Sequence, residues 1–399
     1  MTQHITPTLS ATEPPPVMEA RRWIDGVTFP GNRPLLNLSQ AAPADPPPDP
    51  LRQAMADIVM SDAAAHLYGP VLGIPELRAR VATDWSLAYG GTVRPDQVAI
   101  TSGCNQAFTA TMATLAAPGD NVILPVPFYF NHKMWLDMQG VAARLLETDA
   151  ALLPHAEDAA RLIDAKTRAI VLVSPNNPGG VEYPAQTLAD FRDLARARGI
   201  ALIVDETYRD FDARDGAPHA LFADPDWDET LIQLYSFSKA YRLTGHRVGA
   251  VCAAPARLAE VEKWLDTVTI CPSGLGQRAA LWGMQHLGDW LAGERREILS
   301  RRAAMDAGFA ALPDWQVLGC GAYFAYVAHP FDVASDVVAK ALVTRASLLL
   351  LPGTMFGPLR AQGGSGRAEA TLRIAYANAD RTGIATLFER LADVTETGL

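Results

Sequence analysis

The chain has 399 residues, of which 49% are apolar and 8% aromatic, enough for a globular protein of two ordinary domains. Its net charge of -10 argues against nucleic acid or an anionic membrane surface as a partner. The four cysteines are scattered, which favours reduced thiols in a cytoplasm over a disulfide framework or a metal site. No apolar run approaches the ~20 residues that span a bilayer, and residues 1–16 lack the apolar stretch of an export signal. We therefore expect a cytoplasmic protein with no membrane segment.

The first quarter of the chain is rich in proline. We expect no fixed structure for residues 1–20 until something packs on them, and an extended segment for residues 41–50, which contain five prolines. Helical apolar spacing follows at residues 51–60 and 75–89. The loop at residues 68–73, with two glycines and a proline, separates these two predicted helices.

Strand and helix signals then alternate along the middle of the chain. The predicted strands are 98–101, 122–124, 141–146, 169–173, 201–204 and 231–235, and the predicted helices are 105–116, 131–138 and 184–198. Such alternation predicts an α/β fold with a mainly parallel sheet covered by helices on both faces. In sheets of this kind, ligands bind beyond the carboxyl ends of the strands.

Helices dominate after Pro255, and the end of the chain is typical of a smaller α+β unit. Its predicted strands lie near 323–327, 348–350 and 371–375, and its predicted helices near 333–344 and 381–394. We expect three parts: residues 1–49 as an N-terminal arm and part of a small domain, residues 50–289 as a large domain, and residues 290–399 as a small C-terminal domain.

Lys239 stands in a hydroxyl-rich turn that directly follows the predicted strand 231–235. The chain has only five lysines, and Lys239 alone sits between strand-like segments, flanked by Ser236, Ser238 and Arg247. This neighbourhood suggests the covalent anchor of a cofactor. By itself, the Ser-x-Ser-Lys pattern could equally be a solvated surface loop. The residues at the other strand ends distinguish the two interpretations.

Three other predicted strands also end in residues with distinctive chemistry. Residues 101–105 lie between a strand and a helix, where backbone N–H groups can hold a phosphate. Asn177 lies in a rigid turn between two prolines that can aim its side-chain amide. Asp205 ends an apolar strand and should face a cation, and Tyr208 follows three residues later. Each turn alone could be purely structural.

Together, a phosphate cup, an amide, a carboxylate and a lysine match the protein groups that pyridoxal 5′-phosphate requires. Asp205 would pair with the protonated ring nitrogen, and Asn177 and Tyr208 would hydrogen-bond the phenolic oxygen of the ring. Lys239 would bind the aldehyde and later move the substrate's Cα proton. The four strand ends therefore predict a cofactor site of this kind.

These ordered motifs resemble the class I/II aminotransferases of pyridoxal-phosphate fold type I, of which aspartate aminotransferase is the best-known member. The resemblance covers about residues 35–395. It implies a large domain with a mainly parallel, seven-stranded sheet covered by helices, and a smaller α+β domain. It also implies a ping-pong transfer of an amino group between an amino acid and a 2-oxo acid, and a homodimer with shared active sites.

The resemblance also implies roles for particular residues. Lys239 would form the Schiff base, Tyr129 would stack on the cofactor ring, and His132 would support Asp205. The residues implied to hold the phosphate are Gly103, Cys104, Asn105, Ser236, Ser238 and Arg247. Tyr68 would reach the phosphate of the partner subunit across the dimer. Arg373 would bind the substrate's α-carboxylate, for which a planar guanidinium is well suited.

Three positions depart from the usual family pattern. Residues 177–180 read Asn-Pro-Gly-Gly where Asn-Pro-Thr-Gly is usual, and Ala41 stands where a substrate-contacting glycine is common. The residues that dicarboxylate-selective members of the family use to bind the distal carboxylate are absent. Residues 264–277 contain no arginine, and Asn105 stands where another subgroup has a lysine. Because an unpaired buried carboxylate costs several kcal/mol, we expect a neutral or aromatic amino donor.

Three alternatives to this interpretation stay open on the sequence. The same cofactor chemistry serves lyases that act by β- or γ-elimination, and an aspartate-type aminotransferase is also compatible with the motifs. The effector-binding module of a transcription regulator is disfavoured, because residues 1–50 are too short and proline-rich for a helix-turn-helix domain with its linker.

Overall fold

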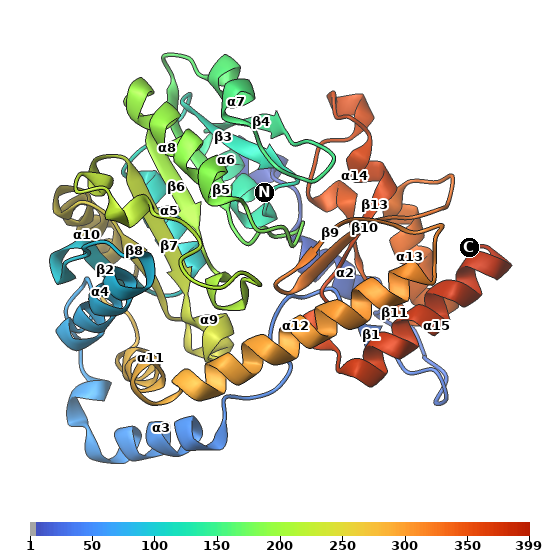
Figure 1. Cartoon of the computed structure of the whole chain (residues 1–399), viewed down its shortest axis with the longest axis horizontal. Helices are drawn as coiled ribbons and strands as arrows, with labels where there is room; N and C mark the ends of the chain where they lie inside the picture. Colours follow the sequence, from blue (N-terminus) through green and yellow to red (C-terminus); the bar gives the residue numbers. More distant parts are fainter. Residues whose placement is uncertain (1–4) are drawn as a thin grey trace.

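A seven-stranded sheet forms the centre of the larger part of the molecule in the computed structural model, which describes residues 5–399 (Figure 1). Its strand order is β2-β8-β7-β6-β5-β3-β4, and β8 is antiparallel to both of its neighbours while the other pairs are parallel. The strands are β2 Val98–Thr101, β3 Asn121–Val126, β4 Ala142–Glu147, β5 Thr167–Val173, β6 Ala201–Asp205, β7 Leu231–Ser236 and β8 Gly249–Cys252. The predicted α/β fold with a mainly parallel sheet is confirmed.

Helices cover both faces of this sheet. Ile170 and Leu172 of β5 pack in one apolar core with α4, α8 and α11, whereas Ala169 and Val171 pack in another with α5, α6 and α10. Alternate side chains of a strand point to opposite faces, so a strand buried on both sides is continuously apolar. The helices of this part are α3 Asp49–Ser61, α4 Pro75–Tyr89, α5 Cys104–Ala113, α6 Phe130–Gln139, α7 Ala156–Leu162, α8 Ala185–Arg198, α9 Phe237–Ala240, α10 Pro255–Thr269 and α11 Gly274–His286.

A four-stranded antiparallel sheet, in the order β12-β13-β10-β9, forms the smaller part. Its strands are β9 Gln316–Gly321, β10 Phe324–Ala328, β12 Leu351–Pro352 and β13 Thr371–Ile374. Its helices are α12 Gly288–Ala310, α13 Ser335–Ala346, α14 Arg367–Ala370 and α15 Arg381–Thr397. The strand predicted at 348–350 is two short strands, because β11 (Leu348–Leu349) pairs with β1 (Leu36–Asn37) and β12 pairs with β13. The exact domain boundaries stay a prediction.

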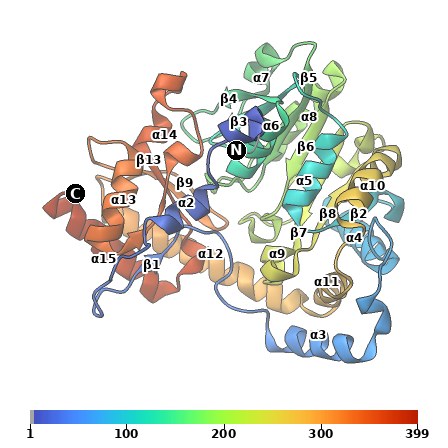
Figure 2. The ribbon, with the colours of Figure 1, turned by 180° about the vertical axis from the view of Figure 1, so that it is seen from behind.

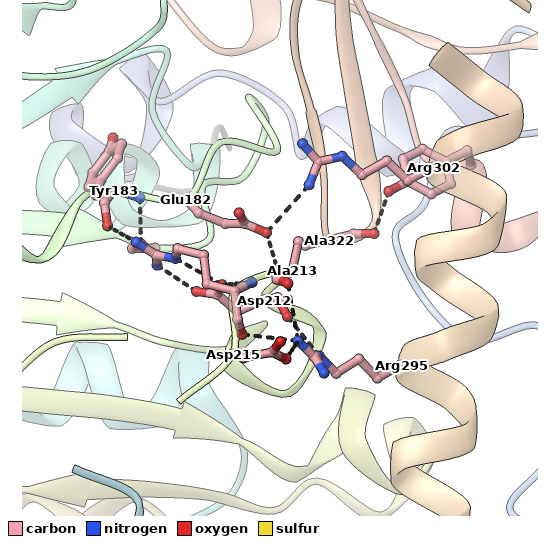
Figure 3. A network of polar contacts seen from close by, with 11 residues as sticks. Glu182, Tyr183, Asp212, Ala213, Asp215, Arg295, Arg302 and Ala322 are labelled. Atoms are coloured by element: carbon pink, nitrogen blue, oxygen red, sulfur yellow. Dashed lines mark hydrogen bonds and ion pairs between the residues drawn. The ribbon is translucent and has the colours of Figure 1, made fainter. Parts of the chain in front are cut away.

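The long helix α12 crosses between the two parts (Figure 1). Arg295 on this helix donates hydrogen bonds to the carbonyl oxygens of Asp212, at 2.8 Å, and of Arg214, at 3.0 Å (Figure 3). About two turns further along, Arg302 lies 3.6 Å from the carboxylate of Glu182. These contacts connect the loops that follow β5 and β6 to α12. They hold the carboxyl ends of these two strands close to the smaller part.

The N-terminal segment has a fixed structure in the described part of residues 1–20, where it packs on the rest of the chain. Two short helices form, α1 (Pro7–Ala11) and α2 (Pro16–Arg22). Ala20 is fully buried and packs in a cluster with Phe130 and Tyr326. These partners lie more than a hundred residues away, so local composition could not show them.

The chain between β1 and α3 then passes from the smaller part to the larger, as Figure 2 shows from behind. It contains neither helix nor strand, as predicted for most of residues 41–50. Across residues 5–399, no helix combines the length and the apolar composition needed to cross a bilayer.

Candidate active site

The carboxyl ends of β5, β6 and β7 and the start of α5 meet at one cavity of about 360 Å³. The pairing brings these ends together, because Val173 lies opposite Asp205 and Asp205 lies opposite Leu234. Most of the predicted site residues line the cavity: Ala41, Cys104, Asn105, Tyr129, Asn177, Asp205, Tyr208, Ser236, Ser238, Lys239, Arg247 and Arg373. Side chains from strand ends far apart in sequence thus face one space.

Lys239 lies on α9, a single helical turn that follows β7. Its Nζ donates a hydrogen bond to the carbonyl oxygen of Ala41 at 2.6 Å. Burial lowers the pKa of Lys239 to about 8, and the positive charges of Arg247 and Arg373 act in the same direction. A fraction of the amine is therefore neutral near pH 7, which is the form that can act as a nucleophile or a base.

Asp205 is buried at the end of β6, and donors surround both of its carboxylate oxygens. Oδ1 accepts from the backbone N–H of Thr207 at 3.0 Å and from the Thr207 hydroxyl at 2.7 Å. The thiol of Cys104 lies 3.6 Å from the same oxygen. The Nε2 atom of His132 lies 3.3 Å from Oδ2, and the His132 ring stacks on Phe108. The carboxylate is therefore held in one orientation.

Sequence reasoning missed Thr207, although it also lines the cavity. A signal was present: threonine two residues after an aspartate commonly donates to that carboxylate in a local turn. Burial raises the pKa of the neighbouring Cys104 thiol well above its usual value, which keeps the thiol protonated.

Gly103 is not among the described residues that line the cavity, but it leaves room for Arg247, which does line it. Its φ of +90° suits glycine, and a Cβ added there would lie 2.1 Å from Nη2 of Arg247. The Nη1 atom of Arg247 donates to the hydroxyl of Ser238 at 3.4 Å, and Ser236 accepts from the backbone N–H of Ser238 at 3.3 Å. A guanidinium and two hydroxyls thus lie close to the N-terminus of α5, which suits an anion.

Two tyrosines enclose the cavity. The Tyr129 hydroxyl donates to Asn105 Oδ1 at 3.3 Å and accepts from Asn131 at 2.9 Å. Burial raises the pKa of Tyr129 to about 12, and it raises the pKa of Tyr208 well above its usual value. Because of these raised pKa values, both hydroxyls stay protonated and able to donate. The Tyr208 ring packs against the ring of Phe324 from β10.

Arg373 lies on β13, between two other strands of the small sheet, and is almost fully buried. Its Nη1 donates to Asn177 Oδ1 at 3.0 Å, and its Nη2 donates to the carbonyl oxygen of Ser39. The guanidinium lies over the rings of Phe324 and Phe356. Burial lowers the pKa of Arg373 to about 10. Among the described residues its Nε has no hydrogen-bond partner, which is a suitable arrangement for an anionic ligand.

The structure does not bring Tyr68 into the cavity of its own chain. Its side chain is 80% exposed, on the loop before α4. The backbone N–H of the next residue, Gly69, donates to the sulfur of Cys271 at 3.4 Å, so this loop lies against the end of α10.

The cavity mouth contains residues that the sequence did not single out. Val17, Met18 and Arg21 come from α2, and Gln40 comes from the segment after β1. Their position depends on how the N-terminal helix packs, and no local pattern indicates it.

Comparison with known proteins identifies the family of this chain. A model of the family "Aminotransferase class I and II" matches residues 33–391. The chain belongs to the class I and II aminotransferases. The aminotransferase is 28% identical to the aromatic aminotransferase ISS1 of Arabidopsis thaliana over 87% of either chain. It is 33% identical to the valine–pyruvate aminotransferase of Mycobacterium tuberculosis, over 62% of this chain and 63% of that protein.

The fold is also that of solved aminotransferases. The structure of aspartate aminotransferase from Thermus thermophilus with maleate covers 98% of this chain, with a TM-score of 0.88 and 22% sequence identity; the match spans 100% of that chain. The protein is therefore an aminotransferase of fold type I, and its cofactor is pyridoxal 5′-phosphate.

The residues of this cavity fit that cofactor. Glycine at position 103 leaves room for Arg247 at the anion-binding end, and an added Cβ would close that space. Lys239 offers an amine with a lowered pKa, and Asp205 offers a fixed carboxylate for a protonated ring nitrogen. The cavity therefore offers a group for the phosphate, a group for the aldehyde and a group for the ring nitrogen of the cofactor.

Proposed function

We propose that this aminotransferase works through Lys239 and takes a neutral or aromatic amino acid as its amino donor. The observation that carries the proposal is that Lys239, Asp205 and Arg373 line one cavity although they come from α9, β6 and β13. These elements belong to both sheets of the molecule, so the site lies where its two parts meet.

Each of these residues has a distinct task in the proposed reaction. Pyridoxal phosphate supplies an electron sink for the bond that breaks at the substrate's Cα. Lys239 would anchor the cofactor, and its amine, once free, would take the proton from that Cα and deliver it to the aldehyde carbon of the cofactor. Asp205, fixed by Thr207 and His132, keeps the ring nitrogen protonated. Arg373 orients the substrate through its α-carboxylate.

Around these central residues, the remaining side chains position the cofactor. Asn177 and Tyr208 would donate to the phenolic oxygen of the ring, and Tyr129 would stack on its face. The groups proposed to hold the phosphate are the backbone N–H groups of Gly103, Cys104 and Asn105, the hydroxyls of Ser236 and Ser238, and Arg247. Ala41 narrows the space beside the substrate.

Apolar side chains at the mouth support a neutral or aromatic donor. Val17 and Met18 from α2 and Phe130 from α6 lie there beside Tyr129. Within the part of the chain that the structure describes, no residue of 264–277 lines the cavity. Two relatives carry names that refer to aromatic substrates and to valine with pyruvate.

We also propose a homodimer in which Tyr68 completes the phosphate site of the partner subunit. Exposed apolar residues lie next to Tyr68 in the chain or near Cys271, which the Tyr68 loop contacts: Leu67, Val268 and Ile270. This surface is continuous with the cavity rim, because Thr269 accepts a hydrogen bond from Gln106 at 2.5 Å, one residue after Asn105. An exposed apolar patch beside an incomplete site is typical of an interface.

Given its scattered, free cysteines, we place the protein in the cytoplasm.

The proposal is tested with single half-reactions over the common amino acids, followed by absorbance. The amino form of the cofactor should accumulate with neutral or aromatic donors and return to the aldehyde form when pyruvate or 2-oxoglutarate is added. A lyase would instead release product without needing a 2-oxo acid. In Lys239→Ala, the near-visible band of the lysine-linked cofactor should disappear, and its retention would refute the assignment of Lys239.

The dimer is tested by complementation between two impaired variants. Lys239→Ala and Tyr68→Ala are each expected to be weakly active. Co-expression should restore activity, because a mixed dimer contains one site with Lys239 from one chain and Tyr68 from the other. Activity no higher than the sum of the two separate variants, or a monomeric mass by light scattering, would contradict shared sites.

A further inference from the structure

Residues 39–41 contact three cations of the active site in succession. The carbonyl oxygen of residue 39 accepts from Arg373, and that of residue 41 accepts from Lys239 Nζ at 2.6 Å. Between them, the side-chain Oε1 of residue 40 accepts from Nη2 of Arg21 at 2.6 Å. A single short segment therefore positions the proposed carboxylate-binding arginine, the lysine and an arginine from α2.

Arg21 differs from its neighbour Arg22 in what surrounds its charge. The Arg22 guanidinium lies 2.7 Å from the carboxylate of Glu19, whereas Arg21 has no ion pair among residues 5–399 and contacts only the neutral amide of Gln40. Arg21 lines the cavity and Arg22 does not. The mouth of the site thus carries one positive charge that no carboxylate of the described chain compensates.

A charge count over the cavity wall shows what this arginine lacks. Among residues 5–399, the cavity is lined by four cationic residues, Arg21, Lys239, Arg247 and Arg373, and by one carboxylate, Asp205. In the proposed function, Arg247 pairs with the phosphate, Arg373 with the α-carboxylate of the substrate, and Lys239 binds the aldehyde. Only Arg21 is left without an anion.

We propose that Arg21, held by Gln40, binds the distal carboxylate of a dicarboxylic 2-oxo acid, the amino acceptor. The inference rests on the proposed function in so far as Arg373 binds the α-carboxylate of the same molecule. Residues 39 and 40 are consecutive, and their Cα atoms lie only about 3.8 Å apart. Arg21 and Arg373 also line the same cavity of about 360 Å³, so the two guanidinium groups can bind the two ends of one short substrate.

The same arginine is compatible with a neutral or aromatic donor. Arg21 is exposed at the mouth, so water solvates its charge when an uncharged side chain occupies the cavity. A solvated charge loses little when it stays unpaired, in contrast to a buried one. One site can thus accept an uncharged donor in one half-reaction and a dicarboxylic acceptor in the other.

The test compares Arg21→Gln with Arg21→Lys and with the matched control Arg22→Gln in the cofactor-loaded enzyme. For Arg21→Gln, kcat/KM should fall about tenfold or more with 2-oxoglutarate, as for loss of a charge-assisted hydrogen bond, and less than about twofold with pyruvate. Arg21→Lys should recover part of the loss. Arg22→Gln should leave both values unchanged.

Binding of two unreactive acids gives a readout that does not depend on turnover. Arg21→Gln should weaken glutarate binding about tenfold, measured by calorimetry on the loaded enzyme, and leave butyrate binding unchanged. Equal effects on glutarate and butyrate, or no effect on glutarate, would overturn the role of Arg21. A wild-type enzyme that transfers no amino group to any 2-oxo acid would instead refute the proposed function, while the glutarate measurement would still decide on Arg21.

Discussion

Lys239 should make the stability of the cofactor-free protein depend on pH in a predictable direction. Burial, with the charges of Arg247 and Arg373, lowers its pKa from 10.5 to about 8. In the unfolded chain the side chain returns to its ordinary value. The difference corresponds to about 3 kcal/mol between the two protonation states. The folded protein therefore bears this cost whenever Lys239 is charged.

The sign follows from proton binding in the two states. Below pH 8 both the folded and the unfolded chain hold the proton, so the whole cost of burying the charge is present. Between pH 8 and 10.5 the unfolded chain still binds the proton and the folded protein has lost it. Stability contributed by this residue therefore rises with pH across that window.

Lys239→Met isolates this effect, because methionine is similar in length and carries no charge. At pH 7 the cofactor-free variant should be more stable than the wild type by up to about 3 kcal/mol, less the roughly 1 kcal/mol hydrogen bond to Ala41. The gap should shrink as the pH approaches 10. Urea unfolding at equal protein concentrations measures it.

Lys263→Met is the control, since Lys263 lies on the surface in an ion pair with Glu260. This change should alter the free energy of unfolding by less than about 0.5 kcal/mol at each pH. A gap for Lys239→Met that stays constant from pH 7 to 10, or that widens, would show that the buried amine is not destabilised in its charged form.

Three further substitutions test the site. Arg373→Lys should raise KM for amino and 2-oxo acids about tenfold and change kcat less, because lysine cannot reproduce the bidentate fork; unchanged steady-state kinetics would remove Arg373 from the substrate. Thr207→Val, which deletes a donor to Asp205, should weaken cofactor binding about fivefold in a fluorescence titration, with Thr207→Ser as the restoring control. Gly103→Ala should displace Arg247 and weaken cofactor binding more strongly, with unchanged far-UV circular dichroism.

The sequence alone predicted six of the seven strands of the large sheet, all except β8, and which side chains gather at its carboxyl edge. Continuous apolar strands such as 170–173 are a local signal, because burial on both faces leaves no polar position. Parallel strands share one carboxyl edge, so Asn177, Asp205 and Lys239 could be expected to meet there without any knowledge of packing.

Only the tertiary structure decided which residues form the mouth of the site. Arg21 belongs to a segment whose proline-rich composition resembles that of a disordered tail, and it reaches the cavity because Ala20 packs into a core with Tyr326, about three hundred residues away. The contact between Arg373 and Asn177 likewise joins the two parts of the molecule. The spacing of apolar residues along the sequence shows which side of one segment is buried. Contacts such as these depend on how side chains from distant segments pack together.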